Sequence, residues 1–223
     1  RMSKPIPPAA APRATWPVFA VLAALCLSNA PYWWPGLADV ITGLLSGAPD
    51  RALANRDFAN YWLAGRQGIG GQVMALFDQP SHQAALEAAQ GLGSLEIRAW
   101  SYPPHMLLLT LPLGLMPYPA AYAVFMLASG AFFIVAARTF IAATGLQAGR
   151  AAVWLLMMPF FAVQVLTGQN GFLFGGVILL ALAWRQTSPV LTGLMLAILT
   201  MKPQLGFLFP VLLLAERNYA AIA

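Results

Sequence analysis

The residues with the clearest chemical potential are a carboxylate and an amine far apart in the chain, Asp57 and Lys202. Asp57 opens an aromatic-rich stretch, residues 55–65, inside the long polar interval of the sequence. Lys202 interrupts the apolar run 189–215. Because a lysine at mid-membrane costs a few kcal/mol, we expect it at the outer meeting point of two short helices. Beside the Asp57 loop, its ammonium would offer a cation for a phosphate at the membrane surface.

The composition indicates that lipid is the main solvent of this chain. Hydrophobic residues make up 60% of the 223 residues and charged residues only 9%, whereas a soluble domain has about 25% charged residues. The net charge is +5, but Lys and Arg stand singly between apolar stretches, as the positive-inside rule expects. Nucleic acid is therefore not an expected partner. The single Cys26 excludes an internal disulfide and a cysteine-based metal site.

The N-terminal part predicts a leader followed by a membrane span. Residues 1–15 are rich in Pro and Ala and carry basic side chains, which is typical of a disordered cytoplasmic leader. Residues 16–34 form the first apolar run, which is long enough to cross a bilayer and has aromatic residues at both ends. A signal peptide cleaved at residues 28–30 is the alternative. We favour a retained span with the N-terminus inside.

Residues 35–104 form the polar interval, which holds nearly all of the acidic side chains and is expected to be an extracytoplasmic loop. After Asp57, the aromatic residues Phe58, Tyr61 and Trp62 follow a helical spacing. This pattern predicts a short helix whose aromatic face lies along the lipid headgroups. Asp57 stands where a carboxylate caps N–H groups, and the glycines from Gly65 onward are expected to end the helix.

A second helix is expected later in the same loop, from Pro80 to Gln90, where Leu86 and several alanines form a weak apolar face. Asp78 or Ser81 can cap its first turn. With the preceding helix, it makes the loop a carrier of short interfacial helices.

The remainder, residues 105–223, reads as further spans, so the expected fold is all-α, a polytopic transmembrane helical bundle. Basic residues place the turns near Arg138, Arg150, Arg185 and Arg217 on the inside. The expected elements are, in order, a half-helix after His105 broken by Pro112 and Pro117, a span at 119–143, a span at 151–167 kinked at Pro159, an outward polar turn at 168–171, a span at 172–184, and the two short helices around Lys202.

An ordered set of short motifs resembles glycosyltransferase family 87, which includes polyprenyl-phosphate-mannose-dependent alpha-mannosyltransferases with the GT-C fold. The motifs are Asp57-Phe58-x-x-Tyr61-Trp62-x-Ala64, Phe77-Asp78, Tyr102-Pro103-Pro104, Gly168-Gln169-Asn170, and Gly193 followed by Lys202-Pro203-Gln204. The resemblance runs from about residue 16 to the end of the chain. Phe77 stands where the family often has Tyr. Because family members are longer, we expect this chain to be the N-terminal half of such an enzyme.

The resemblance implies transfer of a sugar, mannose or another hexose, from a polyprenyl-phosphate carrier to a hydroxyl of a glycolipid or glycan. The transfer would take place with inversion on the outer side of the plasma membrane. Asp57 matches the family's catalytic aspartate, which removes the acceptor proton. Lys202 or a loop arginine would stabilise the leaving phosphate. The other candidate substrate-binding residues are Tyr61, Trp62, Tyr102, His105, Gln169, Asn170 and Gln204.

No cofactor or metal is expected, and the sequence has no Asp-x-Asp pair and only two histidines. Structural alternatives remain for the candidate residues. Asp57 could be a helix cap or a surface acid, Lys202 a snorkelling or structural lysine, and Gln169-Asn170 a turn between helices. His105, Tyr61 and Trp62 could be interfacial anchors.

For the whole protein, the alternative is a non-enzymatic polytopic membrane protein, either a transporter or a scaffold subunit. A transporter would also favour broken helices and an intramembrane lysine. It would not need a long outer loop with an aromatic helix that begins at a carboxylate.

Overall fold

The computed structural model describes residues 34–45, 57–90, 99–145 and 160–221, together with the single positions 20, 24 and 31. Within these ranges every regular element is a helix, which confirms the all-α part of the expected fold. The expected leader, nearly all of the span at 16–34, and Pro159 with the first part of the span at 151–167 lie outside the described residues.

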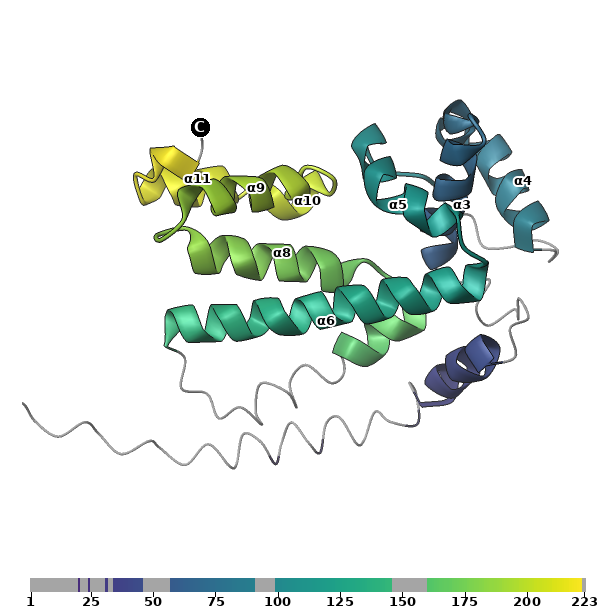
Figure 1. Ribbon diagram of the computed structural model, residues 1–223, viewed down its shortest axis with the longest axis horizontal. Coiled ribbons are helices and arrows are strands. Elements are labelled where there is room, and N and C mark those ends of the chain that lie inside the picture. The colour runs from purple at the N-terminus through teal and green to yellow at the C-terminus, as the bar shows by residue number, and fades with distance from the viewer. Residues whose placement is uncertain are drawn as a thin grey trace, which may run out of the picture.

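The order of the helices along the chain can be followed in Figure 1. They are an unlabelled helix Trp34–Leu45, α3 Phe58–Ile69, η1 Val73–Phe77, α4 Gln79–Gln90, η2 Pro104–Met106, α5 Leu107–Gly114, α6 Tyr118–Thr144, a helical segment at 160–167, α8 Gly171–Trp184, α9 Pro189–Leu199, α10 Pro203–Gly206, α11 Phe209–Ala215 and η3 Tyr219–Ala221.

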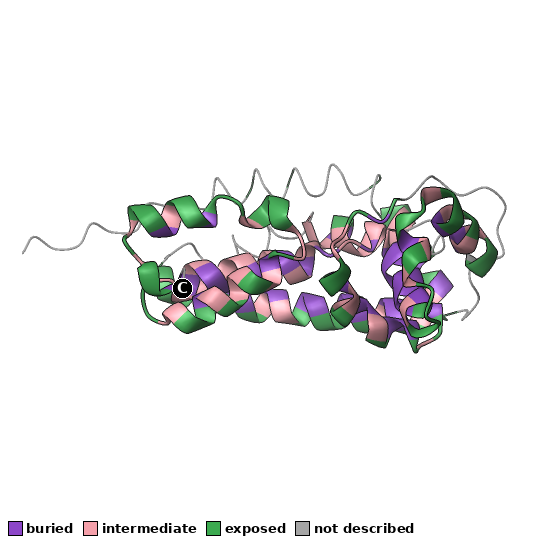
Figure 2. Ribbon diagram, turned by 90° about the horizontal axis from the view of Figure 1, so that it is seen from above, coloured by how far each residue is buried: buried purple, intermediate pink, exposed green. Residues whose placement is uncertain are grey.

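The long helices lie side by side, and the helices of the loop gather at one end of them. Helix α6 packs against α8, and α8 packs against α9. Helices α3, α4 and α5 stand together at the end where α6 begins (Figure 1). Figure 2 shows an elongated molecule in which buried residues line the inner faces of the long helices and gather at the α3 end. The loop therefore forms a packed subassembly on the bundle.

Helix α6 matches the span expected at 119–143. With 27 residues, it is the one helix in the described part of the chain that is long and apolar enough to cross a membrane. The other apolar helices have 10–17 residues, among them α8 and α9. Large apolar side chains are nevertheless exposed on several helices, including Leu127, Val190 and Val211. An exposed apolar surface of this kind is typical of contact with lipid or with another protein.

The aromatic face of α3 does not lie along lipid headgroups, so that expectation is wrong. Phe58, Tyr61 and Trp62 are only 0%, 2% and 6% exposed. The Phe58 ring packs against Tyr122 and Phe125 of α6, with ring centroids 5.0 and 5.4 Å apart. The spacing indicated an apolar face correctly, but protein covers it because α5 and α6 pack on it.

The glycines of α3 also have a different role from the one expected. The helix continues through Gly65 to Ile69 and ends before Gly70. Gly65 crosses Gly114 of α5 so closely that a Cβ atom on Gly65 would lie 2.8 Å from the Gly114 backbone nitrogen. Only glycine fits this crossing, which lets α5 pack along α3. Pro112 lies inside α5 rather than ending it.

Helix α4 is close to its prediction and braces α3. Asp78 caps it, because its carboxylate accepts a hydrogen bond from the Ser81 backbone N–H at 3.1 Å. The buried His82 faces α3, where its Nε2 lies 2.7 Å from Asn60 Oδ1. Asn60 in turn donates from its Nδ2 to the Ala99 carbonyl at 3.3 Å. This fixes the Asn60 amide so that His82 Nε2 is the donor. Burial lowers the pKa of His82.

The run 189–215 breaks at the expected place. Lys202 lies between the end of α9 and the start of α10 at Pro203. A second break follows, because α10 ends at Gly206 and α11 begins at Phe209. The proline after Lys202 lacks a backbone N–H and fits the first turn of the new helix.

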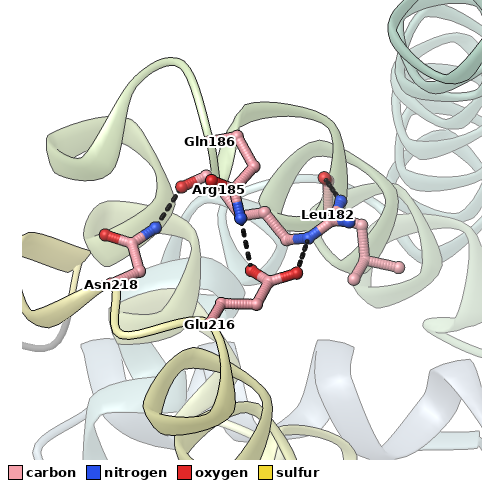
Figure 3. A network of polar contacts seen from close by, with 5 residues as sticks. All are labelled: Leu182, Arg185, Gln186, Glu216 and Asn218. Carbon is pink, nitrogen blue, oxygen red and sulfur yellow. Dashed lines mark hydrogen bonds and ion pairs between the residues drawn. The ribbon is translucent and has the colours of Figure 1, made fainter.

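A polar clasp at the far end of α8 joins it to the end of α11 (Figure 3). Arg185 donates from Nε to Glu216 Oε1 at 2.9 Å, and Gln186 donates from Nε2 to Glu216 Oε2 at 2.7 Å. The Asn218 side-chain amide donates to the Arg185 carbonyl. Arg185 and Arg217 therefore lie near the same end of the bundle, and their place on the inner side of the membrane stays a prediction.

Candidate functional site

The start of α3 is docked on the turn that precedes α8. The Asp57 backbone N–H donates to the Thr167 carbonyl at 2.9 Å. The next residue, Gly168, has φ of +65°, and a Cβ atom there would lie 2.7 Å from the Phe58 Cβ. Both the left-handed backbone and the close approach require glycine at this position. The outward turn predicted at residues 168–171 is thus the surface that holds Asp57.

The Asp57 side chain belongs to a polar contact across the fold rather than to its own helix. It makes no capping hydrogen bond to α3. Its Oδ2 accepts a hydrogen bond from the side-chain amide of Gln169, a residue far along the chain. Asp57 is thus the N-cap residue of α3 by position, but its side chain does not form the expected capping hydrogen bond. The half-buried carboxylate is oriented by an amide instead.

Asn170 connects two more of the predicted residues. Its buried side chain donates from Nδ2 to the Tyr102 hydroxyl at 3.0 Å and accepts from Lys202 Nζ at 2.9 Å. Asn170 is the N-cap residue of α8, yet its side chain makes no capping bond. The Gly171 N–H is bound by Gln164 Oε1 at 2.9 Å. Residues 168–171 thus lead into α8, but the Asn170 side chain hydrogen-bonds to Tyr102 and Lys202 instead of capping the helix.

Tyr61 completes the group from the first turns of α3. Its hydroxyl lies 3.0 Å from the Tyr102 hydroxyl, and the two ring centroids are 5.6 Å apart. Burial raises the pKa of the Tyr61 hydroxyl well above its ordinary value, and Tyr102 and the Asp57 carboxylate act in the same direction. Tyr61 therefore stays protonated at physiological pH and can donate or accept a hydrogen bond, but it cannot act as an anionic base.

These contacts define what we call the polar cluster, whose members are Asp57, Tyr61, Tyr102, Gln169, Asn170 and Lys202. Asp57 joins the cluster through Gln169, and Lys202 joins it through the adjacent Asn170. Lys202 Nζ also lies 5.9 Å from the centroid of the Phe174 ring. The cluster therefore holds a carboxylate and an ammonium, which amide groups orient, and its members come from four separate chain segments.

The other predicted substrate-binding residues have different surroundings. Trp62 donates from Nε1 to the Met116 carbonyl at 2.9 Å, which ties α3 to the link before α6. His105 Nε2 lies 3.0 Å from the Thr200 hydroxyl, so it joins η2, directly before α5, to the end of α9. Gln204 is exposed on α10. These three do not take part in the hydrogen bonds that hold the polar cluster together.

Sequence reasoning missed the buried network that links α3 and α4, formed by Asn60, His82 and Gln67. Asn60 and Gln67 are seven residues apart in α3 and are both buried. A polar pair at this spacing in a helix with an apolar face is a signal that could have predicted a buried partner. Among the described residues, no group of three or more His, Cys, Asp or Glu side chains could hold a metal ion.

Comparison with known proteins gives one match. The family model of glycosyltransferase family 87 matches residues 100–223, more than half of the chain. Neither a curated protein nor a solved structure matches. The matched range is shorter than the resemblance expected from residue 16. It contains Tyr102, Gln169, Asn170 and Lys202 but not Asp57 or Tyr61. The place of Asp57 and Tyr61 in the polar cluster therefore rests on their hydrogen bonds to Gln169 and Tyr102.

Proposed function

Because the chain belongs to glycosyltransferase family 87, we propose that it transfers a hexose, mannose being the first candidate, from a polyprenyl-phosphate carrier to an acceptor hydroxyl. Family membership implies a glycosyltransferase, which uses a sugar donor and an acceptor. The donor class, the sugar and inversion at the anomeric carbon are the proposed part. The observation that carries the proposal is the polar cluster, which brings Asp57 and Lys202 together.

Asp57 is the proposed general base. The acceptor oxygen attacks the anomeric carbon from the face opposite the carrier, the bond from that carbon to the phosphate oxygen breaks, and the acceptor proton moves to the Asp57 carboxylate. A single base suffices for inversion, because the phosphate leaves as an anion and needs no proton. The hydrogen bond from Gln169 supports this role, since a base acts efficiently only when it is held in one orientation.

Lys202 is the proposed partner of the carrier phosphate. Its ammonium would stabilise the negative charge that grows on the leaving group. The hydrogen bond from Lys202 to Asn170 supports this role because it limits the positions that the flexible side chain can take. The Tyr61 and Tyr102 hydroxyls lie on the other side of Asn170 and could bind substrate oxygens.

A membrane setting follows from the family, whose members are generally membrane proteins, and from the apolar helix α6. We propose a multi-pass protein of the plasma membrane with its N-terminus in the cytoplasm and the polar cluster on the outer side. The acceptor would then be a glycolipid or glycan. The broken helix at Lys202 would also suit a transporter, but family membership favours the enzyme.

Replacing Asp57 by Asn or Ala tests the proposal. Losing a general base typically lowers the rate by about 10²–10⁴-fold. We therefore expect transfer from polyprenyl-phosphate mannose to fall by at least about 10²-fold in membranes that contain either variant. The amount of expressed protein should stay unchanged. Asp78→Asn is the matched control, because Asn also caps helices well and Asp78 lies outside the cluster. Normal turnover by both Asp57 variants would remove Asp57 as the base.

A further inference from the structure

Trp100 carries a buried donor that nothing in the described part of the protein satisfies. The side chain is 7% exposed, and its indole Nε1 has no hydrogen-bond partner among the described residues. A buried unpaired donor costs about 1–3 kcal/mol, and such groups are rare in native proteins. The residues around Trp100 must therefore account for its unpaired N–H.

The ring of Trp100 packs on the polar cluster. Its centroid lies 5.1 Å from that of Tyr102, whose hydroxyl is bound by Tyr61 and Asn170. Trp100 thus extends the aromatic side of the cluster, on the segment that leads into Tyr102. The indole N–H is the one unmet donor recorded among the described residues in contact with the cluster.

A second buried tryptophan shows what a structural indole looks like in this fold. Trp62 is equally buried, at 6% exposed, and its N–H is bound by the Met116 carbonyl. The other buried group without a partner in the described ranges, the Thr192 hydroxyl, belongs to α9 and has no recorded contact with the cluster. Burial alone therefore does not explain why the Trp100 N–H lacks a partner. What sets Trp100 apart is that its ring packs against Tyr102 of the polar cluster.

We propose that Trp100 is a donor-binding residue, whose indole N–H donates to an oxygen of the sugar-phosphate headgroup of the carrier. This inference rests on the proposed function and adds a residue to it. An indole provides one N–H donor, which suits a sugar hydroxyl or a phosphate oxygen, and an apolar ring, which suits the C–H face of a sugar. A bound headgroup oxygen would satisfy the indole donor of Trp100.

The test compares Trp100→Phe with Trp62→Phe, since both substitutions remove an N–H and keep an aromatic ring. In purified protein without ligand, we expect Trp100→Phe to lower the thermal unfolding midpoint less than Trp62→Phe does, because both variants lose part of a buried ring but only Trp62→Phe also breaks a hydrogen bond. Trp62→Phe should lower it by about 2–4 °C for each kcal/mol lost. With polyprenyl-phosphate mannose as the probe, Trp100→Phe should bind about tenfold more weakly, the effect of one hydrogen bond.

Bare polyprenyl phosphate, as a second probe, identifies the bound oxygen. Weaker binding of both probes indicates a phosphate oxygen, and weaker binding of the mannose-linked probe alone indicates a sugar hydroxyl. Unchanged binding of both probes, or a midpoint lowered as far in Trp100→Phe as in Trp62→Phe, overturns the inference, because the N–H would then have no ligand or would have an internal partner. If the unsubstituted protein binds neither probe, the proposed function fails instead.

Discussion

Asn170 is the residue through which most of the polar cluster is connected. Its amide donates to Tyr102 with one end and accepts from Lys202 with the other. Its neighbour Gln169 binds Asp57. Two adjacent amides in one turn thus orient a carboxylate and an ammonium from distant parts of the chain. Amide side chains suit this task, because each combines donors and an acceptor without adding charge.

Replacing Lys202 by Ala should weaken binding of a polyprenyl-phosphate donor by about 10–100-fold, because a charged hydrogen bond contributes about 1.5–3 kcal/mol. Acceptor affinity should change much less. Measuring the Kd of the donor and the KM of the acceptor separates the two effects.

Arg66→Ala is the matched control for Lys202. Arg66 is also a cation of this region, but it is exposed, and its guanidinium lies 5.2 Å from the centroid of the Trp62 ring, outside the cluster. Because a loop arginine is the alternative partner of the phosphate, Arg66→Ala also tests that alternative, and we expect it to leave donor affinity nearly unchanged. If the Lys202→Ala variant binds the donor as tightly as the unsubstituted protein does, Lys202 does not bind the carrier phosphate.

Most of the cluster could be predicted from residue types, and its connections could not. Asp57, Gln169, Asn170 and Lys202 stand out because polar side chains are scarce in so apolar a chain. Which of them touch depends on how segments fold against one another. The unpaired N–H of Trp100 left no trace in the sequence, since a tryptophan before a proline-rich turn is common in proteins of any class.

The crossing of α3 and α5 determines where Asp57 lies. Gly65→Ala should destabilise the protein by about 1–3 kcal/mol, because the added methyl group would meet the backbone of α5. Differential scanning fluorimetry of the purified protein would detect this as a lower midpoint. Activity should fall too, since a shift of α3 moves Asp57 away from Gln169.

Gly70→Ala provides the control within the same segment. Gly70 follows α3 with φ of −76°, and a Cβ atom there would come no closer than 3.4 Å to its neighbours. Alanine fits that backbone, so the midpoint should stay or rise slightly. Equal midpoints for the two variants would mean that α3 and α5 do not cross at Gly65.

Helix α3 is the element whose surroundings could not be predicted from the sequence. Period and capping residues predicted α4, α6 and the break at Lys202 closely, because local signals set helix boundaries. The aromatic spacing of α3 could not show what covers its face. Lipid headgroups and a protein core both favour Phe, Tyr and Trp, and the choice depended on α5 and α6. Gly65 looked like a helix end because close helix crossings use the same residue.

At the scale of the whole molecule, we expect the loop that carries α3, η1 and α4 to face one side of the membrane and the Arg185 end of α8 to face the other. In a Cys26→Ala background, Met74→Cys should react with a membrane-impermeant maleimide in intact cells, because Met74 is 80% exposed in the outer loop. Thr187→Cys, exposed next to the clasp at Arg185, should react only after permeabilisation. The reverse pattern would place the polar cluster inside the cell.

The shortness of α8 has a consequence for the bilayer around it. Its 14 residues separate the polar cluster from the Arg185 clasp by about 21 Å at 1.5 Å per residue. The hydrocarbon layer is about 30 Å thick. If α8 spans the membrane, we expect the lipid beside this helix to be thinner than average, with Lys202 below the level of the surrounding headgroups. A lipid-borne sugar would then reach the enzyme by sinking below the level of the surrounding headgroups.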